Sequence, residues 1–235
     1  MSVVFLFPTS SEIPSSMKKW GIKSRKVYSL SGAIPSSVVY TGPGKSMADT
    51  MQRISSAFSS SLFISIGYAG GLSEKLKAGD IVLCQRFLCE NRDTILPFSG
   101  LNAQVASRLK EQKVFFHEGD CYTADRVLSC PENKESLGQK GNLVVEMENY
   151  WAAQKSIERK IPFVAIRIVL DSMDSFLPDL SDTLKENGDI SFLHTFWHIL
   201  RSPQHIPDMI HLYKITRKIE PVLLRCCSVL AGIEI

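Results

Sequence analysis

Short apolar runs alternate along the chain with segments in which apolar residues recur every three or four positions. Runs of this kind are typical of buried strands, and the wider spacing is typical of amphipathic helices. The alternation predicts an α/β fold with a largely parallel or mixed sheet. We expect strands at residues 3–7, 26–30, 38–40, 62–66, 81–87, 114–118, 143–145 and 163–170.

Three helices are expected between these strands. Met47, Met51, Ile54 and Phe58 form a stripe at i, i+4, i+7 and i+11, which indicates one amphipathic helix. Residues 101–110 and 148–160 give two more. Since no repeat period and no low-complexity linker divides the chain, residues 1–235 are expected to form a single domain.

A helical C-terminal extension is expected from about residue 190 to residue 235, where the chain is rich in aromatic and aliphatic residues with basic residues interspersed. Proline interrupts helices, so we expect two or three helices packed on the sheet edge. Two further roles stay open for the extension: an apolar cover for a hydrophobic substrate, and peripheral contact with a membrane surface. The interrupting prolines are Pro203, Pro207 and Pro221.

Composition and charge exclude several classes of protein. The formal net charge of +3 is close to balanced and no block of like charges occurs, which argues against a nucleic-acid partner. No run approaches about 18 apolar residues, so a membrane-spanning protein is not expected. The first apolar run is too short for an export signal. The six cysteines include no C-x-x-C pair, which indicates buried thiols in a reducing cytoplasm.

Two stretches look like known motifs but lack a required residue. "YTGPGKSMAD" suggests a triphosphate-binding loop, yet Val39 stands where the motif needs a glycine five positions before Gly44. A short glycine turn between strand and helix still points backbone N–H groups at a polar or anionic group. His194 and His198 share a helical face, but Thr195 replaces the glutamate of a zinc protease. We therefore expect no metal site.

Candidate chemistry collects where three expected strands end, which is where ligands of open α/β sheets usually bind. Residues 65–83 are rich in glycine, which allows close approach of the backbone to a ligand. Residues 144–154 carry Glu146 and Glu148 at a strand end. In residues 162–174 a near-continuous apolar strand delivers Asp171, which is either a helix N-cap or a proton donor with a raised pKa.

Taken together and in this order, these stretches resemble the purine nucleoside phosphorylase and methylthioadenosine/S-adenosylhomocysteine nucleosidase superfamily. The resemblance runs from the first strand to about Asp174, and rests on "TGPGK", "GYAGGLSEKLKAGDIV", "VVEMEN" and "IPFVAIRIVLDSMD". It implies a three-layer α/β/α sandwich with a mixed central sheet. The implied activity is cleavage of the N-glycosidic bond of a purine nucleoside through an oxocarbenium-like cation. No cofactor is implied, apart from inorganic phosphate as a co-substrate if the reaction is phosphorolysis.

The resemblance also implies roles for individual residues. Asp171 corresponds to the aspartate that protonates N7 of the leaving base, and Glu148 to the glutamate that holds the ribose hydroxyls. Met147 packs against the ribose, and Glu12 positions the attacking water in the hydrolytic branch. The remaining residues fall into a base-binding or substrate-binding group, namely Tyr122, Thr123, Tyr68, Ala69 and Gly70, and a phosphate or water pocket formed by Gly42, Gly44 and Lys45.

The chain departs from the superfamily pattern at several positions. Leu170 precedes Asp171 where the nucleosidases usually have serine, which removes one hydrogen bond that would orient the acid. Tyr150 and Trp151 replace small residues and could reshape the pocket or an interface. No convincing set of arginines for phosphate is present, so phosphorolysis and hydrolysis stay open. Arg53 and Arg86 are candidates by location only.

The tail resembles the C-terminal part of the hopanoid-associated phosphorylases, which act on adenosylhopane. The resemblance implies an adenosine derivative with a bulky apolar 5′ group as the small-molecule partner, and a homo-oligomer. Two alternatives stay open: a methylthioadenosine/S-adenosylhomocysteine nucleosidase or futalosine hydrolase, and a non-catalytic nucleoside-binding protein. The positions that carry the tail resemblance are Leu177, Pro178, Asn187, Gly188, Leu200, Arg201, Pro203 and Pro207.

Overall fold

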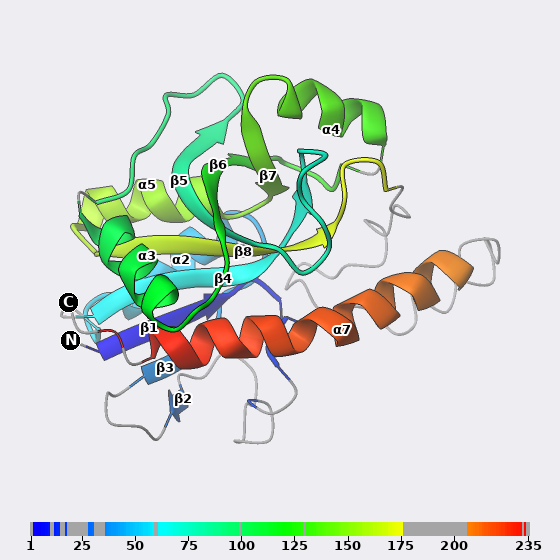
Figure 1. Ribbon diagram of the computed structural model, residues 1–235. Helices are drawn as coiled ribbons and strands as arrows, with labels where there is room; N and C mark the ends of the chain where they lie inside the picture. Colours follow the sequence, from blue (N-terminus) through cyan, green and yellow to red (C-terminus); the bar gives the residue numbers. More distant parts are fainter. Residues whose placement is uncertain are drawn as a thin grey trace.

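The computed structural model describes residues 2–9, 12–14, 17, 28–30, 36–58, 61–98, 100–128, 130–175, 206–231 and 233. The histidine pair and, except for Pro207 in the first turn of α7 (Ile206–Leu230), the tail positions of the hopanoid resemblance lie outside these residues. Within them, eight strands form one mixed sheet in the order β2-β3-β1-β4-β7-β6-β5-β8 (Figure 1). The strands are β1 (Ser2–Phe7), β2 (Tyr28–Leu30), β3 (Ser36–Tyr40), β4 (Ser61–Gly71), β5 (Ile81–Cys89), β6 (His117–Thr123), β7 (Asn142–Glu146) and β8 (Phe163–Asp171).

In one half of the sheet, the five strands β4 to β8 pair with one another in a closed ring. β8 pairs with β4 in parallel and with β5 in antiparallel, and β7 joins β4 to β6. The pairing of β4 with β8 shifts register between Ala69 and Gly70, and from Gly70 the strand also pairs with β7 on its other side. An irregularity of this kind bends a strand. The bend brings the ends of β4, β7 and β8 around one space.

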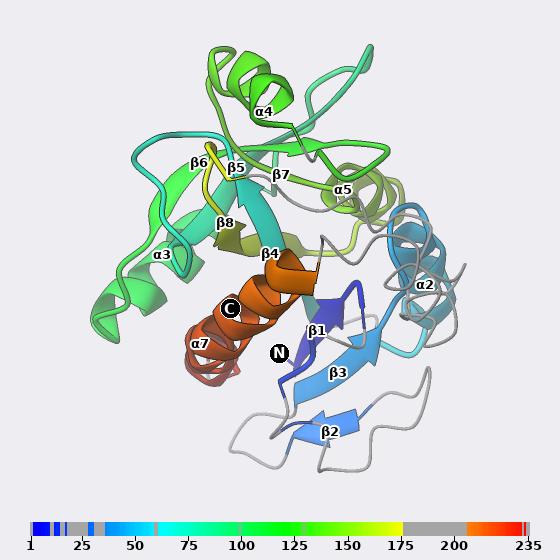
Figure 2. The same ribbon diagram turned by 90° about the vertical axis from the view of Figure 1, so that its right-hand side faces the viewer.

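Alternating residues of the strands face two separate layers of helices, as a period of two requires. In β1, Val3, Phe5 and Phe7 pack in one hydrophobic core with α3 (Leu101–Glu111) and α7 (Ile206–Leu230). Val4 and Leu6 pack in the other core with α2 (Ser46–Ile54) and α5 (Asn149–Arg159). Figure 2 shows α3 and α7 on one side of the sheet and α2 and α5 on the other. This arrangement confirms the three-layer α/β/α sandwich.

All eight predicted strands are present, but one is displaced. The apolar residues that suggested a strand at 114–118 lie mostly before β6, and Phe115 is 75% exposed. β6 itself contains polar residues, which are accommodated because Asp120 pairs with Arg86 and Thr123 donates to Glu146. The predicted helix over Met47–Phe58 also ends early, at Ile54, although Phe58 still packs on the core.

Two helical predictions need correction. A short helix, α4 (Pro131–Gly138), was not predicted, because it has no apolar stripe and only Lys134 is buried on it. In the described part of the extension, one helix of 25 residues replaces the predicted interrupted set and includes Pro221. This helix packs on a face of the sheet through fully buried residues rather than at the sheet edge. No helix in the ranges given above combines the length and apolar character that crossing a membrane requires.

We expect Leu223→Ala to lower the free energy of unfolding by about 2–5 kcal/mol, the usual cost of a large-to-small change in a core. Leu223 is fully buried on α7, in the core shared with β1 and α3. Chemical denaturation would measure the loss. Lys218→Ala, at an exposed position of the same helix, is the control and should change stability by less than about 0.5 kcal/mol. Equal effects of both substitutions would show that α7 does not belong to the core.

Candidate active site

A cavity of about 560 Å³ lies at the carboxyl ends of the parallel strands. The last residues of β4, β7 and β8 and the segments that follow β1, β3, β6 and β7 line it, and α7 contributes Leu212, Tyr213 and Thr216. Cavities of about 300–1,000 Å³ are typical of small-molecule sites. Most of the wall is apolar, and its ionisable side chains gather in two places. One holds Asp171 and Lys134, and the other holds three glutamates.

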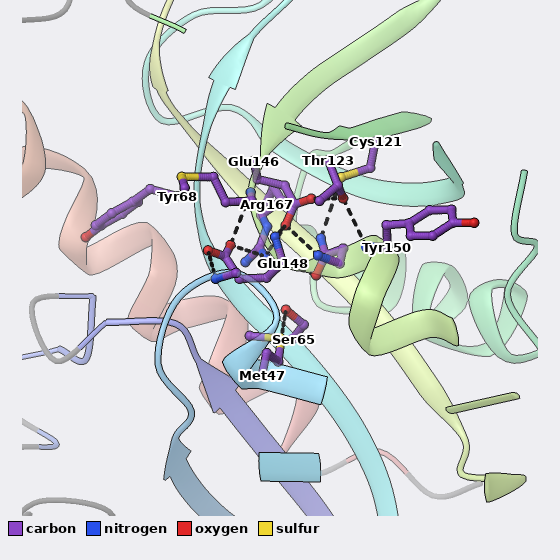
Figure 3. A network of polar contacts seen from close by, with 12 residues as sticks. Met47, Ser65, Tyr68, Cys121, Thr123, Glu146, Glu148, Tyr150 and Arg167 are labelled. Carbon is purple, nitrogen blue, oxygen red and sulfur yellow. Dashed lines mark hydrogen bonds and ion pairs between the residues drawn. The ribbon is translucent and has the colours of Figure 1, made fainter. Parts of the chain in front are cut away.

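Arg167, in the middle of β8, organises the glutamate end from behind the cavity wall. Its side chain is fully buried, and Nη2 donates to Glu146 Oε2 at 2.7 Å, to Asn149 Oδ1 at 3.0 Å and to Glu148 Oε2 at 3.4 Å (Figure 3). Nε and Nη1 have no hydrogen-bond partner among the described residues. A buried guanidinium requires paired carboxylates, and it finds them where β7 ends.

Glu146 is the fully bonded carboxylate of the cluster. Besides Arg167, the backbone N–H groups of Glu148 and Asn149 donate to its Oε2 at 3.0 and 2.8 Å. The Thr123 hydroxyl donates to its Oε1. Since these donors come from β6, β8 and the first turn of α5, Glu146 joins three elements and satisfies the N-terminus of a helix. Its oxygens are occupied by the protein.

Glu148 keeps hydrogen-bonding capacity for a ligand. Its Oε1 accepts from the Gly44 N–H at 3.1 Å, and its contacts through Oε2, with the Met147 N–H and Arg167, are both 3.4 Å long. Burial raises the pKa of Glu148 to about 8, the charge of Glu146 adds to the rise, and Arg167 opposes it. Glu148 therefore exchanges its proton near neutral pH while facing the cavity.

Glu12 lies on the same side of the cavity, held by backbone groups. The Tyr68 N–H donates to its Oε1 at 3.0 Å and the Thr9 N–H to its Oε2 at 3.0 Å. Burial raises the pKa of Glu12, and the charge of Arg167 opposes the rise. Gly67 lies between these two groups: a Cβ there would stand 2.8 Å from Arg167 Nη1 and 2.9 Å from Glu12 Oε1. A larger residue at this strand position would therefore require the side chains of Arg167 and Glu12 to move.

Asp171 and Lys134 form a buried ion pair at the other end of the cavity. The Lys134 ammonium donates to Asp171 Oδ2 and to the backbone carbonyls of Ser172 and Ser175, at 3.2 and 3.1 Å. Burial raises the pKa of Asp171, and Lys134 opposes the rise. A carboxylic acid in a dry cavity can serve as a proton donor.

Comparisons with known proteins identify the family. A family model described as the phosphorylase superfamily matches residues 22–191, which is more than half of the chain. The chain belongs to the phosphorylase superfamily. This membership confirms the expectation of an enzyme of the nucleoside phosphorylase or nucleosidase type. No curated protein sequence matches the chain.

Several solved structures share the fold of this superfamily member. A methylthioadenosine/S-adenosylhomocysteine nucleosidase from S. pneumoniae with a transition-state inhibitor is 15% identical, with 99% of each chain covered and a TM-score of 0.69. The corresponding nucleosidase from Colwellia psychrerythraea, in complex with adenine, is 22% identical over 73% of this chain and 84% of that chain, with a TM-score of 0.60. Futalosine hydrolase of Helicobacter pylori is 19% identical over 95% and 97% of the chains, with a TM-score of 0.62.

The structure brings most of the predicted site residues of this phosphorylase-superfamily chain to one cavity. Its wall includes Glu12, Tyr68, Ala69, Gly70, Met147, Glu148 and Asp171. Gly42 and Gly44 have positive φ angles of 86° and 57°, and the Gly44 N–H is occupied by Glu148 rather than by a separate anion pocket. Thr123 is 1% exposed and bonded to Glu146, and Tyr122 packs against Leu72, Ala124 and Val145, so neither lines the cavity.

The basic residues suggested for phosphate lie elsewhere. The Lys45 ammonium stands 4.4 Å from the centre of the Trp151 ring. Arg53 donates to the Thr50 hydroxyl, and Arg86 pairs with Asp120. None of these three basic residues lines the cavity. Among the residues the structure describes, no group of three or more His, Cys, Asp or Glu side chains is arranged to hold a metal ion.

Two residues of the site were missed from the sequence. Arg167 had a detectable signal, because a charge inside the apolar strand "FVAIRIVLD" requires a buried partner. Lys134 had none, since it lies in the polar segment "PENKESLG" among charged residues that are exposed.

We expect Glu148→Gln to flatten the pH dependence of stability. The unfolded chain loses the Glu148 proton near pH 4.5 and the folded chain near pH 8, so the free energy of unfolding falls as pH rises between these values. Glutamine carries no proton to lose, so the fall should shrink to the part contributed by other groups with raised pKa values, such as Glu12 and Asp171. Thermal melts from pH 5 to 8 would measure it. Glu74→Gln, at an exposed position, should keep the wild-type slope; an unchanged slope in Glu148→Gln would contradict the raised pKa.

Proposed function

We propose that this enzyme hydrolyses the N-glycosidic bond of a purine nucleoside and releases the base. The observation that carries the proposal is the division of one cavity between a buried acid, Asp171, and a carboxylate cluster containing Glu12 and Glu148. Cleavage of such a bond needs a proton donor for the leaving base at one side and negative charge for the sugar cation at the other. The two ends of the cavity supply these two needs.

Asp171 is the proposed proton donor. Its raised pKa favours the protonated form, and the adjoining wall of Leu170, Val145 and Ala69 keeps the base away from water. The base leaves as a neutral purine once its nitrogen takes the proton. The adenine complex of the similar Colwellia psychrerythraea nucleosidase supports a purine as the leaving group.

Glu148 and Met147 are proposed to hold the ribose, and Glu12 to position the water. Glu148 has an accessible carboxyl with long contacts to the protein, which suits a pair of sugar hydroxyls. Glu12 accepts from backbone groups through both oxygens, so its orientation is fixed before the substrate binds. As the sugar becomes cationic, both groups stabilise it.

The charge balance favours water over phosphate as the nucleophile. Three carboxylates gather at the glutamate end, and the guanidinium of Arg167 lies behind them, outside the cavity wall. Of the basic residues on the described wall, Lys134 is engaged by Asp171, which leaves Arg126. The carboxylates of this cluster that are ionised would repel a phosphate dianion.

The test is base release from a panel of 6-amino and 6-oxo purine nucleosides, with and without phosphate. We expect release without phosphate, and a loss of about 10²–10⁴-fold in kcat for Asp171→Asn and for Glu12→Gln. Asp174→Asn, at an exposed position three residues from the acid, is the control and should keep wild-type kcat.

Three other outcomes would change the conclusion. Release that requires phosphate would replace hydrolysis by phosphorolysis. Full activity in Asp171→Asn would remove the acid assigned here. Binding of nucleosides with no release of base under any condition would leave the non-catalytic nucleoside-binding protein as the remaining function.

We also propose a bulky apolar group on the ribose 5′ carbon, as in adenosylhopane. The side chains of α7 on the wall support it: Leu212 is half-buried, and Tyr213 is 64% exposed and free to be covered by a ligand. Burying about 300 Å² of hydrocarbon would contribute on the order of 7 kcal/mol before ordering costs. The alternative is methylthioadenosine or S-adenosylhomocysteine, on which the similar nucleosidases act according to their names.

Leu212→Asn should lower kcat/KM for a nucleoside with a long 5′-alkylthio chain by about 10-fold, because a polar group then faces the hydrocarbon. Turnover of adenosine should stay unchanged. Ile210→Asn is the matched control, since Ile210 is a 49% exposed apolar residue of the same helix that does not line the cavity. Equal losses with adenosine and with the alkyl substrate would contradict the assignment of α7 to the 5′ group.

We also propose two kinds of partner. Peripheral membrane contact through α7 is supported by exposed apolar Ile210 and Tyr213 beside exposed Lys214 and Lys218. A homo-oligomer is supported by the sequence resemblance alone. Both stay predictions.

A further inference from the structure

Lys134 is an unusual residue for the helix that carries it. α4 connects β6 to β7, and its other charged residues are exposed, whereas the Lys134 side chain is 1% exposed. Lysine is almost never fully buried without a partner, because removing its charge from water is costly. The partner is Asp171, 37 residues along the chain and on the cavity wall.

The contacts of Lys134 fix its ammonium in one orientation. An ammonium has three N–H donors, and Lys134 has three acceptors: Asp171 Oδ2 and the carbonyls of Ser172 and Ser175. The helix is itself fixed on the sheet, since Asn142 of β7 donates to the Leu137 carbonyl at 2.9 Å. No other side chain of the described residues donates a hydrogen bond to Asp171. Its Oδ1 is thus the oxygen left for a substrate.

We propose that Lys134 is the positioning residue of the proton donor: it holds Asp171 by Oδ2, presents Oδ1 to the leaving base, and stabilises the carboxylate that remains after proton transfer. This inference rests on the proposed function. The bond from C1′ to the base nitrogen breaks and its electron pair goes to the base, while the oxygen of the attacking water bonds to C1′ and one proton of that water passes to Glu12 and then to solvent. The proton on Oδ1 of Asp171 goes to a base nitrogen, and Lys134 keeps its three protons beside the new carboxylate. Water returns a proton to Asp171 after the products leave.

Loss of the ammonium should therefore make Asp171 a weaker acid. Burial alone would raise its pKa further, since Lys134 is the charge that opposes the rise. Activity requires protonated Asp171, so it falls as pH rises through this pKa, and a higher pKa moves the alkaline limb to higher pH. Among the described residues, Lys134 is the charged side chain that contacts Asp171, and the other titratable groups on the wall of the same cavity are Glu12, Tyr68, Arg126, Glu146, Glu148 and Tyr213.

The test compares wild type with Lys134→Met, which keeps the length of the side chain and removes its charge. A ¹³C NMR titration of Asp171, with the signal assigned by its loss in Asp171→Asn, and a kcat–pH profile are recorded for each protein. We expect the Asp171 titration and the alkaline limb to move together to higher pH by at least one unit, and kcat on the plateau to fall about 10-fold or more. Lys140→Met, an exposed lysine near the end of α4, should match wild type in both.

If folded Lys134→Met keeps the wild-type titration of Asp171 and the wild-type alkaline limb of the kcat–pH profile, the proposal is overturned. Lys134 would then be a structural link between α4 and β8. A fall in kcat without movement of the limb would do the same. If Lys134→Met does not fold, Lys134→Gln gives the same two readouts, because its amide can still donate to the carbonyls of Ser172 and Ser175. Absence of base release by wild type would refute the proposed function instead, which separates the two failures.

Discussion

The site and the fold depend on one buried guanidinium. Arg167 lies in a strand that pairs on both sides, so its charge has no access to water and must be neutralised by side chains. Glu146 supplies the main partner, and it also accepts from Thr123 and from the first turn of α5. Removing one member of such a pair costs about 3–5 kcal/mol, because the other charge stays buried. The closure of the sheet and the position of the α5 N-terminus are therefore linked to the carboxylate cluster.

The contacts within this cluster differ among its three glutamates. Glu146 takes the short bond from Arg167 and the backbone donors, whereas Glu148 and Glu12 receive weaker compensation for burial, and their pKa values rise. The bonded oxygens of Glu146 make the site rigid, and the carboxyl groups of Glu12 and Glu148 beside it have raised pKa values. The rigidity comes from backbone donors, which a ligand does not need to displace.

Much of the fold was predictable from the sequence, since buried strands leave apolar runs and eight of these were found. The failures occur where polar residues are structural. β6 was displaced in the prediction because its own residues bond to neighbouring side chains, and α4 was missed because its buried residue is a lysine. The carboxylates at strand ends predicted where the cavity lies. The roles of Arg167 and Lys134 were not predictable, because their partners are 21 and 37 residues away in the sequence. Such pairings are visible only once the chain is folded.

The two charged ends of the cavity differ in balance, and this difference matches the proposed chemistry. The acid end pairs one ammonium, that of Lys134, with one carboxyl, that of Asp171, so in the proposed reaction its net charge becomes neutral once Asp171 has given up its proton. At the other end three carboxylates share one guanidinium, and the excess negative charge is relieved when Glu12 and Glu148 hold protons. In the proposed reaction the sugar gains positive charge as the glycosidic bond breaks. That charge also offsets the excess negative charge, and it stabilises the ionised forms of Glu12 and Glu148. In the proposed reaction the cluster would interact more strongly with the transition state than with the neutral nucleoside, which is the condition for catalysis.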